Sequence, residues 1–285
     1  MSRQRPLYQQ PVLSIAVSGV KGGVGTSAIA ANLAVAMAMR GEAALLFDAS
    51  FAHGGVARIL GLKPTARIDD VLDGELTLDQ LILAGPAGLS VIASKFGDIG
   101  LSRLSHLEHA RLIALFSHLR MSADTLIVDT PSGFTDANLA YTSSAREILL
   151  VITEDPSAVD GAASAVHELQ CSYDVSRFRV VVNRARSAHH GREVFAQLDR
   201  AVAGDVDVLL DHAGSIPEDP RIAEAAAAGM AVVEQHPRSS GAMALTKLAE
   251  RMARWPRPVS PSGHIEFFVE RLVQAADPHL VRATA

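Results

Sequence analysis

Residues 12–41 read VLSIAVSGVKGGVGTSAIAANLAVAMAMRG, and this stretch decides the fold. It begins with an apolar, β-rich run at residues 12–17, passes through a glycine-rich turn at 21–27, and continues as an alanine-rich run that ends at Gly41. That order predicts a strand, a phosphate-binding type of loop and a helix. Glycines let backbone N–H groups converge on an anion, and the positive end of the following helix dipole strengthens the attraction.

The turn departs from the usual P-loop pattern G-x-x-x-x-G-K-[ST], in which the lysine reaches the β- and γ-phosphates and the hydroxyl reaches Mg²⁺. Counted back from Ser27, Val20 stands where the first glycine belongs and Thr26 where the lysine belongs. Gly25 and Ser27 fit the pattern, and Lys21 directly precedes the glycine pair. The alternative is a glycine-rich strand–helix turn that binds nothing.

Composition indicates a globular chain with ample core. Of its 285 residues, 48% are hydrophobic and 20% charged, and the net charge is −5, so direct binding of nucleic acid is not expected. A lone cysteine, Cys171, excludes an internal disulfide and fits a reducing cytoplasm; its helical context predicts a buried thiol. The N-terminus lacks the apolar core of a signal peptide, and no run reaches the ~18–20 apolar residues of a membrane span. We therefore expect a cytoplasmic protein.

Strands that alternate with helices predict an α/β fold, a doubly wound, mostly parallel sheet flanked by helices. Strands are expected at 12–17, 43–47, 89–93, 126–128, 148–153, 178–182 and 206–210. Helices are expected at 28–40, 67–72, 78–83, 105–119, 155–173, 192–203 and 239–254, and after residue 220. The expected organisation is a flexible leader (1–11), one domain (12–254), a proline-rich linker (255–263), an amphipathic helix (264–274) and a tail (275–285).

Two aspartates follow apolar strands. Asp129 follows the strand at 126–128 and enters a glycine-containing loop, the arrangement of a Walker B carboxylate that holds Mg²⁺ through water. Asp48 ends the strand at 43–47, at the edge of the sheet where open α/β proteins place ligands. For Asp48 a role near Mg²⁺ is favoured, and the alternative is that it only caps the following turn.

The amphipathic helix at 264–274 carries an apolar stripe. Its members recur at helical spacing: Ile265, Phe268, Val269, Leu272 and Val273. A membrane surface is one partner for this stripe, although one arginine against two glutamates on the polar side is a poor match for anionic lipid. A groove on the same protein or on another protein fits as well.

From residue 13 to 274 the chain resembles the FlhG/FleN branch of the MinD/ParA P-loop family, cytoplasmic proteins that set flagellar number and placement. Besides the early-lysine loop, the matching blocks are LLFDA at 45–49, IDDVLDG at 68–74, GPAGL at 85–89, LIVDT at 126–130, RFRV leading to Asn183, GREVF at 191–195, Ile216-Pro217 with Asp219, and GHIEFFVERLV at 263–273. The last block is specific to this branch.

The resemblance implies a deviant Walker A site for ATP or ADP with Mg²⁺. The phosphate contacts would come from Gly22, Gly23, Val24, Gly25 and Thr26. Ser27 would meet Mg²⁺, with Asp129 in the second shell, and Lys21 would reach the partner's nucleotide across a homodimer. Asn183 would contact the adenine edge, and Ile216 and Pro217 would flank the base. The C-terminal helix would dock on the nucleotide-free protein and be released to the inner membrane or cell pole in the ATP dimer.

Departures from the family's pattern concern hydrolysis. The family uses the second acid of a D-x-D pair to orient the attacking water, and here Ser50 occupies that place after Asp48. Ala52 and Gly55 replace a usual glycine and a usual asparagine in the adjacent switch loop. Together with Thr26, these changes remove phosphate-neutralising charge and water positioning, which dominate phosphoryl transfer. Lys21 and Asp48 remain as the candidate catalytic residues.

The expected function is therefore a FlhG/FleN-like regulator of flagellar number, placement or gene expression, a nucleotide-binding dimerisation switch with impaired or absent ATP hydrolysis. Expected partners are a second copy and a flagellar transcriptional activator or SRP-type flagellar GTPase. One alternative is a slow, genuine MinD-type ATPase that cycles on the membrane. Another is an interaction scaffold that binds no nucleotide, including a TadZ/CpaE- or BcsQ-like localisation factor.

Overall fold

The computed structural model describes residues 12–257, except 51–54, 94–103, 105, 117–118, 120, 134 and 205–206. Several expectations lie outside the described residues. They are the leader, the linker beyond residue 257, the amphipathic helix with Ile265, Phe268, Val269 and Leu272, the tail, and Ala52 of the switch loop.

The described residues form one eight-stranded sheet. Its strands are β1 (Leu13–Ser18), β2 (Ala44–Asp48), β3 (Ile82–Ala84), β4 (Ser90–Ile92), β5 (Thr125–Asp129), β6 (Glu147–Ile152), β7 (Arg177–Ala185) and β8 (Leu209–Pro217). They lie in the order β3-β4-β2-β5-β1-β6-β7-β8, and every neighbouring pair is parallel except β3 with β4. The predicted doubly wound, mostly parallel sheet is confirmed. β1 lies between β5 and β6, at the point where the strand order reverses and α/β proteins bind ligands.

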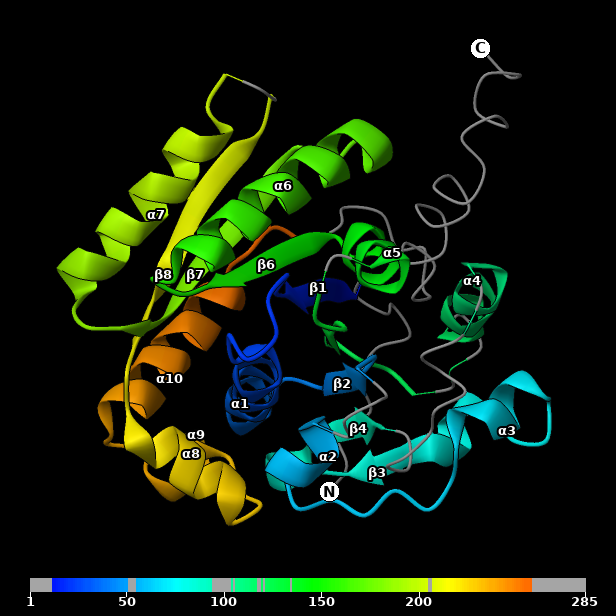
Figure 1. Ribbon diagram of the computed structural model, residues 1–285. Helices are drawn as coiled ribbons and strands as arrows, with labels where there is room; N and C mark the ends of the chain where they lie inside the picture. The colour runs from blue at the N-terminus through cyan, green and yellow to red at the C-terminus, as the bar shows by residue number, and fades with distance from the viewer. Residues whose placement is uncertain are drawn as a thin grey trace, which may run out of the picture.

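Helices cover both faces of the sheet. They are α1 (Thr26–Met39), α2 (Gly55–Ile59), α3 (Ile68–Leu72), α4 (His106–Leu115), α5 (Asp136–Ser144), α6 (Pro156–Tyr173), α7 (Ala188–Val202), α8 (Pro220–Ala227), α9 (Val232–Gln235) and α10 (Ser240–Met252). Figure 1 shows α5, α6 and α7 on one side of the sheet and α1, α8, α9 and α10 on the other. Side chains alternate accordingly, so that Leu126 and Val128 enter one core cluster and Ile127 another.

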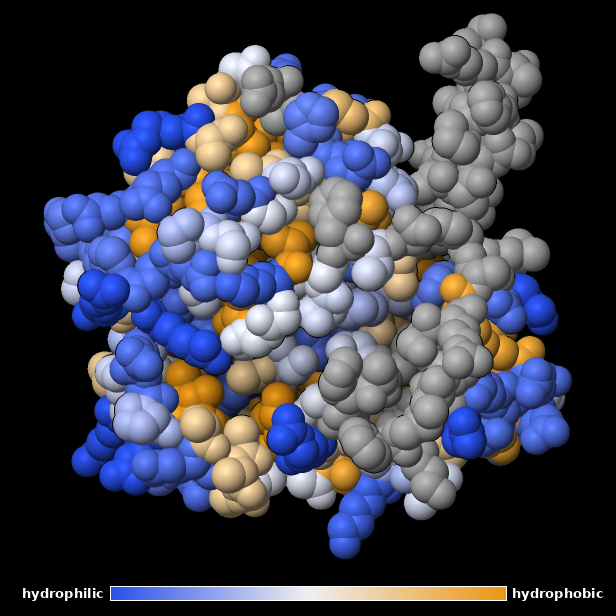
Figure 2. All heavy atoms as spheres, viewed as in Figure 1, coloured by the Kyte–Doolittle hydropathy of each residue, from blue (hydrophilic) through white to orange (hydrophobic). Residues whose placement is uncertain are grey.

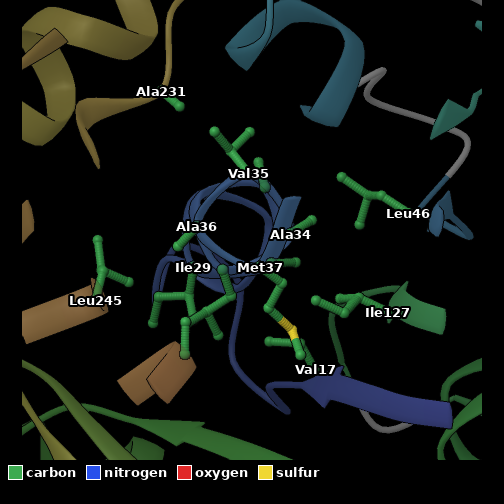
Figure 3. Packing of buried hydrophobic residues seen from close by; sticks show 14 of the residues in the cluster. Val17, Ile29, Ala34, Val35, Ala36, Met37, Leu46, Ile127, Ala231 and Leu245 are labelled. Carbon is green, nitrogen blue, oxygen red and sulfur yellow. The ribbon is translucent and has the colours of Figure 1, made fainter. Parts of the chain in front are cut away.

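α1 is the helix that follows the glycine-rich turn, and it is buried on nearly all sides. Figure 3 shows it end-on, with apolar side chains directed toward the sheet, toward Leu245 of α10 and toward Ala231. A helix that is hydrophobic all round is a core helix, and its many alanines let neighbouring backbones approach closely. This packing fixes the start of α1, and therefore the turn before it, against β1.

Several elements differ from the sequence-based expectation, among them the short helices α2 and α9, which were not predicted. The helix expected at 78–83 is a short 3₁₀ turn, Leu78–Leu81, followed directly by the antiparallel edge strand β3. α5 was not predicted, because residues 136–144 read DANLAYTSS, a polar sequence of low helix propensity. Its start is fixed by Thr135, whose side-chain hydroxyl accepts a hydrogen bond from the Asn138 backbone N–H at 3.2 Å.

Two further predictions are wrong in detail. The last strand, expected at 206–210, is β8 and runs to Pro217, so that Ile216 and Pro217 lie in a strand and not in a loop. Cys171 is exposed, because it lies on the outer side of α6, whereas Leu169 of the same helix is buried.

No helix in the described part of the chain is long and apolar enough to cross a membrane. The face in Figure 2 shows hydrophobic residues in separate patches among hydrophilic ones, outside the area drawn in grey.

Candidate phosphate-binding site

The glycine-rich turn at residues 21–27, the candidate phosphate cradle, contains two glycines with positive φ angles. Gly23 and Gly25 have φ angles of +82° and +97°, which residues with side chains rarely adopt. A Cβ on Gly25 would lie 2.4 Å from Nδ2 of Asn183, so glycine is required there. By contrast, a Cβ on Gly23 would have nothing within 4 Å, and Gly22 and Gly23 are exposed. The backbone of the turn therefore faces open space.

Thr26, the residue at the lysine position, lies at the base of the turn. Its side chain is buried, and Oγ1 would be 2.6 Å from a Cβ on Gly19. The Thr26 side chain therefore fills the space between the turn and the end of β1. It brings no positive charge to the cradle.

Asp48 and Asp129 face each other across β2 and β5. They are register partners at the carboxyl ends of these strands, and both are buried. Neither carboxylate oxygen of Asp129 has a hydrogen-bond partner among the described residues. Burial raises the pKa of Asp129 well above its usual value, and the negative charge of Asp48 raises it further. The Ser27 hydroxyl lies near enough to lower this pKa by polar attraction, although it does not reach the geometry of a hydrogen bond with Asp129.

An unpaired buried carboxylate is costly unless something charged or polar satisfies it. Mg²⁺ with its water ligands would do so here, since it takes oxygen ligands and keeps several waters. Ser27 lies on the same side, at the start of α1. Ser27 and Asp129 supply two of the oxygen donors that Mg²⁺ prefers, and the phosphates of a nucleotide together with water could supply the others. The donor set therefore fits a metal bound together with a nucleotide.

Asp48 also has a local structural role. Its carboxylate accepts hydrogen bonds from the backbone N–H of Ser50 at 3.0 Å and of Val56 at 3.3 Å. Asp48 therefore holds Ser50 and Val56 in place after β2, and its role near Mg²⁺ stays a prediction. Gly55 lies against the metal-binding candidate, because a Cβ there would be 3.0 Å from the Ser27 hydroxyl. The small residue at position 55 leaves Ser27 room.

Lys21 points away from the cradle of its own chain. Its Nζ lies 2.5 Å from Oδ2 of Asp155 and 2.7 Å from the Ser157 hydroxyl, at the start of α6. Asp155 also caps that helix by accepting from the Ser157 N–H. Hydrogen bonds from Lys21 first, and from Ser157, lower the pKa of Asp155 to about 2. The sequence placed Asp155 only at the start of the helix expected at 155–173, and nothing local in the sequence predicts its contact with Lys21.

Of the residues expected to contact the adenine base, Asn183 lies beside the glycine-rich turn. Asn183 is inside β7 rather than at its end, and its Nδ2 donates to the Val24 carbonyl at 2.7 Å. Ile216 is 1% exposed and belongs to the core, whereas Pro217 is partly exposed at the end of β8. Asn183 is itself 7% exposed, so Pro217 is the more accessible of these residues, and their contact with a base stays a prediction.

A buried polar network under the turn was missed by sequence reasoning. Asn138 of α5 donates through Nδ2 to the Ser18 hydroxyl (3.2 Å), to the Thr130 hydroxyl (3.2 Å) and to the Pro131 carbonyl (2.5 Å). Thr142, one turn later, donates to Ser18 at 3.0 Å. The network ties the end of β1 to the loop after Asp129. Because α5 was not predicted from the sequence, Asn138 could not be found either.

Comparisons with known proteins agree with this geometry. Residues 15–232 match the family described as the CobQ/CobB/MinD/ParA nucleotide binding domain. The chain is 38% identical over 264 residues to the antiactivator FleN of Pseudomonas aeruginosa, covering 93% of this chain and 94% of the relative. It is 28% identical over 206 residues to the flagellum site-determining protein YlxH of Helicobacter pylori, covering 71% and 68%.

Solved structures show the same fold. The cell division ATPase MinD of Pyrococcus furiosus superimposes with a TM-score of 0.71 at 24% identity, covering 86% of this chain and 99% of that one. MinD of Pyrococcus horikoshii, solved with Mg-ADP, gives 0.70 at 22% identity, covering 85% and 96%. The chain therefore belongs to the CobQ/CobB/MinD/ParA nucleotide-binding domain family, and within it to the FlhG/FleN branch, with a degenerate Walker A turn.

Proposed function

We propose that this protein is a nucleotide-responsive regulator of flagellar number, placement or gene expression, which binds ATP with Mg²⁺, dimerises, and hydrolyses ATP poorly or not at all. The flagellar role is carried over from the relatives named as an antiactivator and a flagellum site-determining protein. Candidate partners remain a flagellar transcriptional activator or an SRP-type flagellar GTPase.

Nucleotide binding rests above all on one observation: Asp129 is a fully buried carboxylate with no hydrogen-bond partner among the described residues, next to an open glycine turn. A fold that keeps such a group without a ligand carries an unfavourable desolvation term. A Mg²⁺–triphosphate complex would remove that term: the turn would bind the phosphates, and Ser27 and Asp129 would bind the metal directly and through water.

Poor hydrolysis rests on two replacements at the same site. Thr26 contributes a buried hydroxyl where the family's turn carries a lysine, and Ser50 stands where an acid would orient water. Phosphoryl transfer depends mainly on electrostatic stabilisation and positioning, and one such contact is commonly worth about 10²–10³ in rate. The loss of both leaves a site suited to binding.

Lys21 is the cation that could replace the missing charge, from the other subunit. Its present contacts with Asp155 and Ser157 are on the surface, where ion pairs are weak, so a triphosphate can compete for it. In this proposal, nucleotide binding and dimerisation support each other, because the dimer supplies the lysine that the turn lacks. Membrane contact by residues 264–274 in the dimer stays a prediction.

Lys21→Ala tests this proposal. We expect about a tenfold or greater loss of affinity for a non-hydrolysable ATP analogue with Mg²⁺, and loss of the nucleotide-dependent dimer, because a charge-assisted contact disappears. Fluorescence titration and light scattering measure the two. Lys63→Ala, which removes an exposed lysine elsewhere, is the matched control. Equal affinity in wild type and Lys21→Ala would rule out the role across the dimer.

A further inference from the structure

A second concave site lies at the far edge of the sheet. A cavity of about 320 Å³ opens beside β8, the terminal strand, which β6 and β7 separate from β1. Residues of α7 line it on one side and residues of α10 on the other. Figure 1 shows these two helices on opposite faces of the sheet along that edge. The cavity is therefore distinct from the glycine turn and from the acid pair.

Three cations surround this cavity. Arg192 comes from α7, and Lys247 and Arg251 come from α10. None of them forms an ion pair with any residue that the structure describes, and no acidic residue lines the cavity. Clustered like charges repel each other, and a chain with a net charge of −5 has many acids that could have relieved this repulsion. A bound anion would do so.

A bulge in β8 brings its backbone close to the Arg251 side chain beside the cavity. Val180 pairs with His212 and Val181 with Gly214, so that Ala213 is the extra residue of a bulge. Gly214 has a φ angle of +154°. Nη1 of Arg251 donates to the Ala213 carbonyl at 2.7 Å, which fixes the guanidinium at the cavity and satisfies a carbonyl of the edge strand. Another β-strand could not pair with this carbonyl without displacing Arg251, so strand addition is disfavoured.

The remaining wall is polar on one side and apolar on the other. Nε2 of His212 lies 3.2 Å from the Ser215 hydroxyl, and the His212 ring stacks on Phe195 with a centroid distance of 5.1 Å. Burial first, and then the positive charges of Arg251 and Arg192, lower the pKa of His212, although the Gly214 backbone acts in the opposite direction. Both arginines therefore act on the same imidazole. Buried apolar side chains, Val181 and Leu248 among them, complete the lining.

We propose that this cavity binds a small organic phosphate, whose phosphate group lies among Arg192, Lys247 and Arg251 and whose organic part lies on the apolar wall. A phosphate monoester carries nearly two negative charges, and arginine forks match its oxygens in pairs. The cavity is larger than a bare ion needs and falls at the lower end of the range for small-molecule sites. Ile216 also lines it, so an occupant would touch the strand that ends at the predicted base site.

The test uses His212 as a reporter. We would label the full-length protein with ¹³C-histidine, assign the His212 Cε1–Hε1 signal with His212→Gln, and titrate with ribose 5-phosphate, inorganic phosphate and ribose. Ribose 5-phosphate should shift this signal saturably at millimolar concentration or below, inorganic phosphate should bind more weakly, and ribose should have no effect. No shift with ribose 5-phosphate would overturn the proposal. Equal binding of inorganic phosphate would overturn the claim that the organic part of the ligand contacts the apolar wall.

Variants assign the binding to the cavity. Arg192→Gln should weaken the ribose 5-phosphate response about tenfold, because one charge-assisted contact is lost. Arg200→Gln removes an exposed arginine of the same helix that does not line the cavity and should leave the response unchanged. Equal losses of ribose 5-phosphate affinity in the two variants would show that the ligand is attracted by the overall charge of α7 and not bound in the cavity. Lys21→Ala should also leave the His212 response intact; if it abolished the response, the ligand would belong to the glycine turn.

Discussion

Buried charges are paired at the amino ends of the strands and left unpaired at the carboxyl ends. At the carboxyl ends of β2 and β5, Asp48 and Asp129 lie side by side, and both oxygens of Asp129 lack a partner among the described residues. Toward the amino ends of β6, β7 and β8, Arg179 binds Glu147 at 2.7 Å and Asp211 at 3.2 Å. Asp129 in the first region and Arg179 with Glu147 in the second are buried, but an ion pair within the chain compensates the charge only in the second of these two cases.

The region around the Arg179 ion pairs, called the paired end below, also contacts the last described residues of the chain. The Arg179 guanidinium lies 4.3 Å from the ring centroid of Trp255, a cation–π contact. Two residues later, Arg257 donates to the Asp124 carbonyl at 2.7 Å and to Glu42 at 3.3 Å. The paired charges therefore stabilise the fold, whereas the unpaired carboxylate of Asp129 is where we propose that a ligand binds.

The largest effect is expected at the paired end. Arg179→Met would remove the ion-pair partner of the buried Glu147 carboxylate, whereas the partly exposed Asp211 keeps Arg177, and should destabilise the protein by about 3–5 kcal/mol. Urea unfolding measures this loss. Arg177→Met is the matched control, because Arg177 contacts the same Asp211 from an exposed position and should cost about 1 kcal/mol or less. Similar losses for both variants would contradict the distinction between buried and exposed pairing.

A substitution at the unpaired carboxylate of Asp129 should change the free energy of unfolding in the opposite direction. Asp129→Asn removes a buried charge, so the nucleotide-free protein should gain about 1–3 kcal/mol in the free energy of unfolding. The same variant should lose the stabilisation that ATP with Mg²⁺ gives to the wild type. Thermal unfolding with and without nucleotide measures both. A destabilised apo variant would show that Asp129 is satisfied in the folded chain.

The pH dependence gives a second check on Asp129. Its pKa is raised above the usual 3.8 on folding, so the folded chain holds this proton more tightly than the unfolded chain. Its contribution to stability is therefore present below pH 3.8 and is lost as pH rises toward the folded-state pKa. The difference in stability between Asp129→Asn and wild type should grow over that interval. A difference that does not change with pH would contradict the raised pKa.

A smaller effect is expected where the turn meets β7. Asn183→Ala removes the hydrogen bond to the Val24 carbonyl and the side chain that lies against Gly25, and should cost about 1 kcal/mol. If Asn183 also contacts the base, ATP affinity should fall while affinity for inorganic triphosphate should not. Calorimetric titration with both ligands separates the two roles. Equal losses for both ligands would restrict Asn183 to shaping the turn.

Sequence periodicity predicted the parallel sheet and the order of the glycine turn, Asp48 and Asp129, because each of these features is local. Contacts between distant segments were not predictable in the same way. The Lys21–Asp155 pair joins residues 134 apart in sequence, and the Asn138 network depends on a helix whose composition favours turns. The extension of β8 through Ile216 and Pro217 was missed because His212, Gly214 and Pro217 are poor strand residues. Pairing with β7 overrides that propensity.

The central claim is that the chain kept the phosphate cradle and lost the means of cleaving the phosphate. Its most direct test measures binding of labelled ATP–Mg²⁺ and release of phosphate in the same sample, for wild type and for the double variant Thr26→Lys, Ser50→Asp. We expect saturable binding with negligible phosphate release by the wild type, and release at least about 10²-fold faster by the double variant. Brisk release by the wild type, or no binding at all, would contradict it.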